Sequence, residues 1–149
     1  MQETGRLDEM ANEERVEITS SIDIVSARQQ GRALALKLGF VGSDVTLIAA
    51  AISEVARNIV DYANCGEIIL TGVANGGKRG IKIIARDKGP GIPDVAQAMQ
   101  YGYSTCKSLG VGLPGAKWLM DEFDIESKVG KGTVVTMKKW AGKLGYPNP

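Results

Sequence analysis

The chain has 149 residues, of which 44% are hydrophobic, and its formal charge at pH 7 is only +1. These values predict a single domain with an ordinary core, and so small a charge gives no support to a nucleic-acid-binding surface. The chain has no histidine, which excludes a Ser–His–Asp triad and histidine metal ligands. No apolar run approaches the roughly 20 residues of a membrane span, and no signal peptide is recognised, so we expect a cytoplasmic protein.

The first half of the chain predicts one short strand followed by two helices. Residues 1–15 are polar and mixed in charge, without the apolar core of a signal peptide, so we expect a flexible extension before a domain at 16–140. A strand is expected at 16–19. Serines and glycines then delimit a helix at about 20–38 and a second at about 43–63, whose apolar residues recur at helical spacing.

The second half is rich in glycine and predicts two strand hairpins separated by short helices. The turn Asn-Gly-Gly-Lys at 75–78 is a strong hairpin signal. Beyond it, Asp94 caps a short helix, a polar stretch follows, and the tail is expected to fray. The remaining expected elements are strands at 68–74, 81–85, 123–129 and 134–139, helices to about 100 and at 113–120, and the tail at 141–149.

The expected order is β-α-α-β-β-α-α-β-β, in which helices come in pairs between hairpins. This order differs from the strict alternation of a doubly wound parallel sheet. It predicts an α/β (α+β) two-layer sandwich with a mixed, largely antiparallel sheet that carries its helices on one face.

The second expected helix carries a polar triplet on one face. Glu54, Asn58 and Asp61 are spaced by four and then three residues, so they share a side of the helix. An amide oxygen from Asn58 suits a hard cation such as Mg²⁺, and Glu54 can polarise a hydroxyl nearby. A solvated helix face is the alternative explanation.

A second candidate is the run Asp87-Lys88-Gly89-Pro90-Gly91-Ile92-Pro93 after a buried strand. The Asp87 carboxylate can accept a hydrogen bond from the exocyclic amine of adenine. Gly91, with Gly89 and Ile92 beside it, would let the backbone approach a flat base. An ordinary turn would contain the same residue types.

A third candidate, Gly110-Val111-Gly112-Leu113, stands just before an expected helix. Free N–H groups at a helix start, with glycines that allow close approach, form a cradle for phosphates. A flexible connector is the alternative.

The hairpin Gly130-Lys131-Gly132-Thr133 is a fourth candidate. A tight turn explains its glycines, while Thr133 can also donate its hydroxyl towards a pocket.

The order of these four motifs resembles the GHKL ATPase superfamily, which has a Bergerat-type fold and includes gyrase, heat-shock chaperones, histidine kinases and mismatch-repair ATPases. Within it, the stretches at 52–58, 87–94, 110–117 and 119–123 are similar to the stressosome serine/threonine kinases of the anti-sigma-factor-type kinase family. The resemblance covers roughly residues 16–140.

The resemblance implies an ATP- and Mg²⁺-dependent serine/threonine protein kinase. Asn58 would hold Mg²⁺, Asp87 would read the adenine and Gly91 would admit the base. Glu54 would be the general base. Residues 110–113 would present backbone amides to the phosphates, and Lys107 is the one cation of the short stretch at 93–110 available to the γ-phosphate.

The implied substrates are STAS-domain scaffold or antagonist proteins of the stressosome. The implied second partner is the N-terminal region of a PP2C-type phosphatase regulator, which the released kinase activates. No nucleic-acid or membrane partner is expected, and a homodimer is left open. An anti-sigma factor kinase and a non-catalytic nucleotide-binding docking module are the alternatives.

Overall fold

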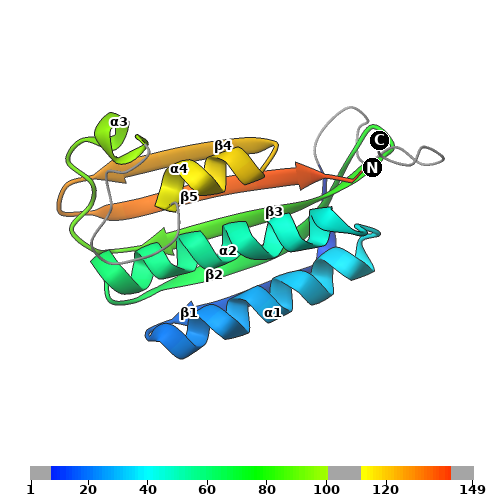
Figure 1. Cartoon of the computed structure of the whole chain (residues 1–149), viewed down its shortest axis with the longest axis horizontal. Coiled ribbons are helices and arrows are strands. Elements are labelled where there is room, and N and C mark those ends of the chain that lie inside the picture. The colour runs from blue at the N-terminus through cyan, green and yellow to red at the C-terminus, as the bar shows by residue number, and fades with distance from the viewer. Residues whose placement is uncertain (1–7, 101–111, 142–149) are drawn as a thin grey trace.

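The computed structural model describes residues 8–100 and 112–141, which form a sheet covered by helices on one face (Figure 1). The element order of this part confirms the expected β-α-α-β-β-α-α-β-β arrangement. Its strands are β1 (Asp8–Ile18), β2 (Gly66–Asn75), β3 (Lys78–Asp87), β4 (Glu122–Lys128) and β5 (Gly132–Trp140), and its helices are α1 (Ser21–Lys37), α2 (Ser43–Tyr62), α3 (Val95–Ala98) and α4 (Gly112–Leu119).

The described strands lie in the order β1-β2-β3-β5-β4. All of these neighbours pair antiparallel, which confirms the expected largely antiparallel sheet, although the described pairs include no parallel one. The two helices between β1 and β2 explain why these strands are antiparallel and not parallel. A single crossover helix returns the chain parallel, but α1 and α2 together make two passes, so β2 starts at the end where β1 stopped. The pairs β2–β3 and β4–β5 are simple hairpins.

The first strand corrects the expected domain boundary. β1 begins at Asp8 and pairs with β2 as far as Ala74, so residues 8–15 belong to the sheet rather than to a flexible extension. An edge strand tolerates charged residues because one of its sides faces water. Arg15 illustrates this, since its guanidinium lies 3.3 Å from the Glu67 carboxylate on β2.

Helix α2 lies at the centre of the helical layer and supplies much of the core. Its apolar residues recur at the expected spacing and are nearly inaccessible to solvent. Burial of each large aliphatic side chain stabilises the fold by roughly 1.5–3 kcal/mol. The buried aliphatic residues of this helix include Val45, Ile48, Ile52, Val55 and Ile59.

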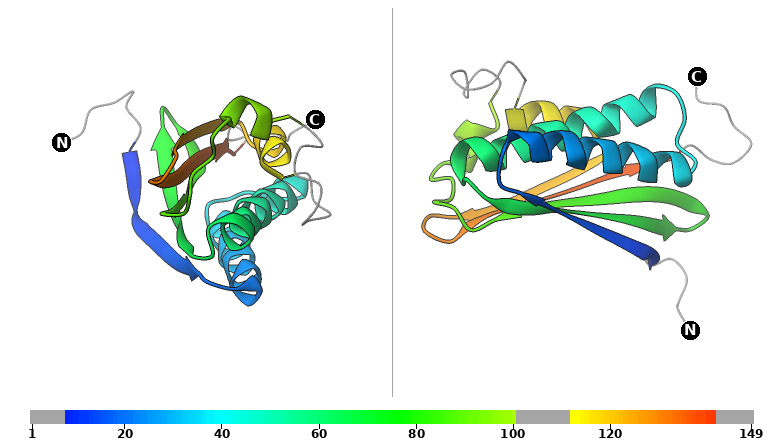
Figure 2. Two further views of the ribbon diagram at one scale, coloured as in Figure 1. Left: turned by 90° about the vertical axis from the view of Figure 1, so that its left-hand side faces the viewer. Right: turned by 90° about the horizontal axis from the view of Figure 1, so that it is seen from below.

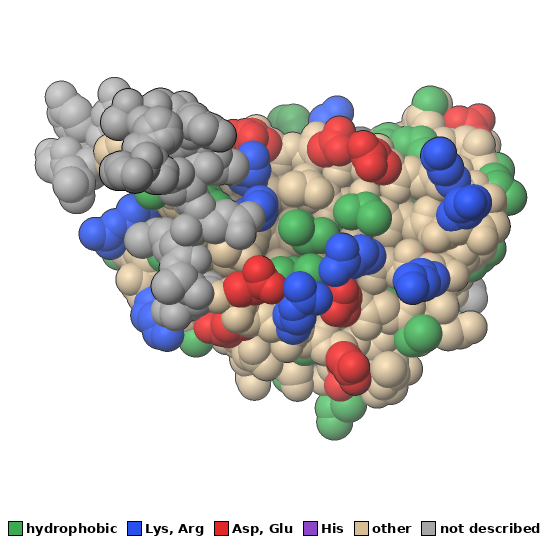
Figure 3. Space-filling view, turned by 180° about the vertical axis from the view of Figure 1, so that it is seen from behind, with side chains coloured by type: hydrophobic (Ala, Val, Ile, Leu, Met, Phe, Trp, Pro, Cys, Tyr) green, Lys and Arg blue, Asp and Glu red, His purple; other side chains and the backbone are tan. Residues whose placement is uncertain are grey.

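Figure 2 shows the two layers from the side, with the helices against one face of a twisted sheet. The opposite face, seen in Figure 3, carries interspersed positive and negative side chains. Arg86 of this face lies 2.6 Å from the Glu67 carboxylate. Among the described residues, no helix combines the length and the apolar character that a membrane crossing requires.

Candidate functional site

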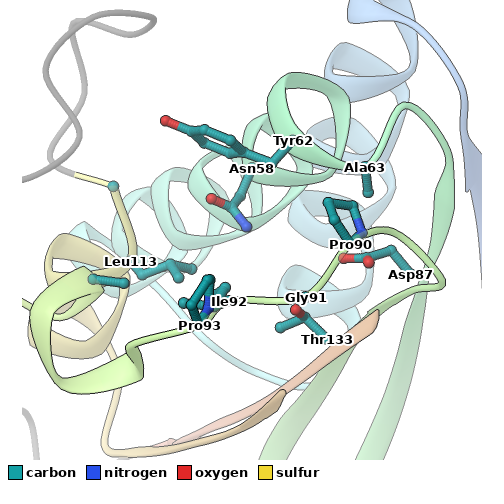
Figure 4. Close-up of a pocket in the computed structure, with 12 residues that line it drawn as sticks. Asn58, Tyr62, Ala63, Asp87, Pro90, Gly91, Ile92, Pro93, Leu113 and Thr133 are labelled. Atoms are coloured by element: carbon teal, nitrogen blue, oxygen red, sulfur yellow. The ribbon is translucent and has the colours of Figure 1, made fainter. Parts of the chain in front are cut away.

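A cavity opens at one end of the sheet, between α2, the loop after β3 and the first residues of α4 (Figure 4). Its volume is about 170 Å³, and it opens to solvent on one side. Its lining is mostly apolar with a few placed polar groups, as is typical of small-molecule sites. The lining residues are Asn58, Tyr62, Ala63, Asp87, Pro90, Gly91, Ile92, Pro93, Ala98, Gly112, Leu113 and Thr133.

The polar floor of the cavity is a single row across the sheet. Asp87 on β3 pairs with Thr133 on β5, and Thr133 pairs with Ser127 on β4. Asp87 is only 9% exposed, and its Oδ1 accepts the backbone N–H of Gly89 at 2.8 Å. This bond orients the carboxylate and leaves Oδ2 as an acceptor for a donor such as an exocyclic amine.

The hydroxyl of Ser127 makes hydrogen bonds that connect the strands under the cavity to the loop after β3. Its Oγ accepts the backbone N–H of Ile92 at 2.7 Å, lies 3.2 Å from the carbonyl oxygen of Gly132, and is 2.8 Å from Thr133 Oγ1. All three bonds are satisfied when Ser127 donates to Gly132 and Thr133 donates to Ser127. Thr133 lines the cavity as expected, and either hydroxyl of the Ser127–Thr133 pair can be the donor.

The backbone of the loop after β3 is fixed against the β4–β5 turn. Gly91 has a φ of +80°, and an added Cβ would meet the backbone of Lys128 and Val129. The N–H of Gly130 donates to the carbonyl of Pro90 at 2.8 Å. Glycine is thus required at position 91 by the packing of two loops, which is a reason independent of any bound base.

Glu54 connects α2 to the helix that closes the cavity. Its Oε1 accepts the backbone N–H of Gly112, the first residue of α4, at 3.1 Å. Its Oε2 lies 3.4 Å from Nη1 of Arg57. The Glu54 side chain is 12% exposed, so the carboxylate is largely shielded. It does not itself line the cavity, but it is bonded to Gly112, which does.

Asn58 follows one turn after Glu54, and Figure 4 shows its side-chain amide directed into the cavity. The described residues contain no group of three or more Cys, Asp and Glu side chains that could hold a metal. A metal bound only by protein ligands therefore does not fit this site. Mg²⁺ does fit, because it commonly takes one or two protein oxygens and completes its shell with phosphates and water.

The remaining predicted site residues have different outcomes. Ile92 and Leu113 line the cavity, whereas Asp61 and Gly89 do not. Asp61 lies nearly one turn beyond Asn58 on α2, and Gly89 acts through its bond to Asp87. Lys107, Gly110 and Val111 lie outside the described residues.

Sequence reasoning missed several residues of the site. The register of the last hairpin would have placed Ser127 opposite Thr133, but the prediction of a turn at 130–133 did not fix that register. Pro90 and Pro93 belonged to the candidate run at 87–93 but were given no role there, and the end of α2 was recognised as part of the lining only in the folded chain. The missed lining residues are Tyr62, Ala63, Pro90, Pro93 and Ala98.

Comparison with known proteins agrees with this fold. Residues 19–139 match the model of the histidine kinase-like ATPase domain family. The chain is 51% identical over 131 residues to the serine/threonine-protein kinase RsbT of Bacillus subtilis (strain 168), covering 88% of this chain and 98% of the relative. It is 34% identical over 122 residues to the anti-sigma F factor of Thermoanaerobacter sp. (strain X514), covering 78% and 84%.

A solved structure gives the same fold. The mycobacterial sensor histidine kinase MprB superposes with a TM-score of 0.53 at 13% identity, over 89% of this chain and all of the other. At that identity the likeness supports the fold alone.

Proposed function

The chain belongs to the histidine kinase-like ATPase domain family and is a protein serine/threonine kinase, and we propose that it transfers the γ-phosphoryl group of ATP to STAS-domain scaffold proteins. Its role in sigma-factor signalling is supported by relatives named as a serine/threonine kinase and as anti-sigma F factors.

One observation supports the site more than any other. Glu54 and Asn58 lie one turn apart on α2, with Asn58 lining the cavity and Glu54 bonded to the start of α4. An acid–base group and a metal-ligating amide therefore flank the place where a helix N-terminus favours phosphate. A solvated helix face would not direct Asn58 into a cavity while Glu54 bonds to a helix start that lines the same cavity.

Each residue has a separate task in the proposed reaction. Asp87 Oδ2 accepts the adenine amine, and the backbone amide of Leu113 at the start of α4 faces the phosphates, since the N–H of Gly112 is bonded to Glu54. Asn58 would hold Mg²⁺, which when bound neutralises charge on the phosphates. Glu54 takes the proton of the substrate hydroxyl. The hydroxyl oxygen then bonds to the γ-phosphorus while the bond between the γ-phosphorus and the oxygen of the leaving ADP breaks. Phosphoryl transfer depends mainly on such positioning and electrostatics.

The proposed partners follow from the same family. The substrates are STAS-domain scaffold or antagonist proteins of a cytoplasmic stressosome. After phosphorylating them, the kinase is released and binds the N-terminal region of a PP2C-type phosphatase regulator, which it activates. The 51% identity to a protein named RsbT over nearly its whole length supports this proposal.

An anti-sigma factor kinase is the second candidate, favoured by the 34% identity to anti-sigma F factors. Such a protein would also hold a sigma factor, so co-purification with one would reverse the choice. A docking module without catalysis is less well supported, because Asn58 lines the cavity and Glu54 is bonded to Gly112 at its edge.

The decisive experiment measures transfer of labelled γ-phosphate from MgATP to a co-expressed STAS-domain protein. We expect transfer by the parent chain and none by Glu54→Ala or Asn58→Ala. Nucleotide binding by the parent without any transfer would instead favour the docking module. Transfer that survives both substitutions would reject the site.

A further inference from the structure

Helix α4 brings backbone N–H groups to the cavity, and both of its ends are held by side chains from other elements. It has eight residues, Gly112–Leu119, and is about 12 Å long at 1.5 Å per residue. At its start, Gly112 donates to Glu54. At its end, the carbonyl of Leu119 accepts a hydrogen bond from Nζ of Lys139 at 3.0 Å.

Lys139 occupies an unusual position for a lysine. It lies on β5 in the alternating set of side chains that face the helices, and it is only 8% exposed. An ammonium in such a place is costly unless it is paired. Besides Leu119, its partner is the Asp121 carboxylate, with Oδ1 at 3.8 Å. The cation at the C-terminus of α4 also interacts favourably with the helix dipole.

The partner carboxylate is itself fixed to the sheet. The backbone N–H of Asp121 donates to the carbonyl of Lys138 at 3.0 Å, and its Oδ2 accepts the N–H of Trp140 at 2.8 Å. The ammonium of Lys139 is therefore held between a rigid β5–β4 edge and the last carbonyl of α4. This arrangement fixes the helix relative to the strand that carries Thr133.

We propose that Lys139 is a positioning residue for the nucleotide phosphates, which acts through α4 from the end of that helix opposite the cavity. The proposal rests on the proposed function, in which the start of α4, with the amide of Leu113, faces the phosphates. A hydrogen bond to phosphate loses strength with shifts of a few tenths of an ångström. Because a short helix moves as a rigid rod, releasing its C-terminus displaces the amides at its start.

The chain supplies a matched control. Lys138 precedes Lys139 on the same strand but faces the open side of the sheet, where its Nζ lies 3.6 Å from the Glu122 carboxylate. Within the described part of the chain it makes no side-chain hydrogen bond or ion pair with α4. Lys139→Met and Lys138→Met remove the same charge and replace the same length of side chain on opposite faces of β5.

The test compares binding of MgATP and of adenosine, by calorimetry, to the full chain and to its variants. We expect Lys139→Met to weaken MgATP binding about fivefold to tenfold, an effect of the order of one displaced hydrogen bond. Adenosine lacks phosphates, so its affinity should stay within about twofold. Lys138→Met should change neither affinity, and Lys139→Arg should restore MgATP affinity to within about twofold of the parent.

Kinetics separate positioning from a general loss of structure. In Lys139→Met the KM for ATP should rise while kcat at saturating ATP stays within about twofold, since Glu54 and Asn58 are untouched. Equal losses of ATP and adenosine affinity, or unchanged MgATP affinity in a variant that merely melts earlier, would overturn the proposal. If Lys139→Met does not fold, Asp121→Asn gives the second test. We expect this variant to lose MgATP affinity by a smaller factor and to keep its adenosine affinity. Unchanged MgATP affinity would contradict the proposal.

The two hypotheses fail differently. A parent chain that binds no MgATP would overturn the proposed function together with this inference. The inference alone would be overturned by a different pattern. In that pattern the parent binds MgATP, Asn58→Ala loses MgATP affinity, and Lys139→Met binds MgATP as tightly as the parent.

Discussion

The carboxylate of Glu54 accepts the backbone N–H of Gly112, joining the middle of α2 to the first residue of α4 at 3.1 Å. This bond gives Glu54 two separable tasks, to hold the start of α4 and to accept a proton. Glutamine can keep the first task, because its amide oxygen accepts the same N–H, but it cannot act as a base.

Glu54→Gln is therefore expected to bind MgATP within about threefold of the parent while transferring phosphate about 10²–10⁴-fold more slowly, the usual contribution of a general base. Glu54→Ala should lose transfer to the same extent and also alter MgATP affinity, since Gly112 loses its acceptor. Rapid-quench transfer assays and calorimetry measure the two effects. Equal transfer rates for Glu54→Gln and the parent would contradict a role as base.

Asn58 and Asp61 are both on α2, but only Asn58 lines the cavity. Asn58→Ala should lower ATP affinity in the presence of Mg²⁺ by at least about tenfold, with a much smaller effect when EDTA removes the metal, because a ligand oxygen is lost. Asp61→Asn should leave both affinities within about twofold. If Asp61→Asn lost as much Mg²⁺-dependent affinity as Asn58→Ala, the metal would lie further along the helix than proposed.

Asp87 combines a bond that shapes its loop with an acceptor in the cavity. Its Oδ1 accepts from Gly89, and Oδ2 is proposed to accept from adenine. Asp87→Asn can keep the loop bond through its amide oxygen, but it then turns a donor towards the base. We expect at least a tenfold loss of ATP affinity with little change in melting temperature. Competition with GTP supplies the control, since the variant should discriminate less between the two nucleotides.

Local periodicity was enough to predict that Glu54 and Asn58 lie together. The spacing of Glu54 and Asn58 places both on one side of a helix whatever the rest of the chain does. The turn at 75–78 was equally local, and its Gly76 and Gly77 adopt φ values of +57° and +86°, as a two-residue hairpin requires. The order of the elements followed from such local signals.

The rest depended on contacts between distant segments. Periodicity put Asp61 on the Glu54 face, but it did not say where along the helix the cavity ends. The row from Asp87 to Ser127 needed the register of three strands, β3, β5 and β4. β1 was underestimated because an edge strand carries polar residues that read locally as an extension.

The open face of the sheet predicts a pH dependence of stability. A side-chain hydrogen bond from Arg86, followed by the charges of Arg86 and Arg15, holds the pKa of Glu67 below its ordinary value. A carboxylate with a lowered folded-state pKa contributes stability that is fully present above its unfolded-state pKa of about 4.3. That stability is lost as the pH falls through the folded-state pKa.

Glu67→Gln should therefore destabilise the chain modestly at about pH 6, and its difference from the parent should shrink towards about pH 3. Urea unfolding at a series of pH values measures this. Glu126→Gln, at the β4 end of the same face, serves as the control for losing a surface charge. A Glu67→Gln difference that grows towards low pH would have the wrong sign.

Two glycines of the β4–β5 turn separate backbone strain from packing. Gly130 and Gly132 have φ values of +82° and +111°, so alanine is strained at both. At Gly130 nothing lies within 4 Å of an added Cβ, whereas at Gly132 it would meet the carbonyl oxygen of Asp87 and come 2.8 Å from Cα of Lys88. Gly130→Ala should thus cost about 1–2 kcal/mol of unfolding free energy, the conformational term alone.

Gly132→Ala should cost more than about 3 kcal/mol, because the clash with backbone cannot be relieved by moving a side chain. It should also weaken ATP binding, since relief of the clash displaces the strand end that orients the Asp87 carboxylate. Chemical denaturation gives the two stabilities, and calorimetry on the folded fraction gives the affinities. Equal stability losses in the two variants would mean that the β3 and β5 strand ends are further apart than they lie here.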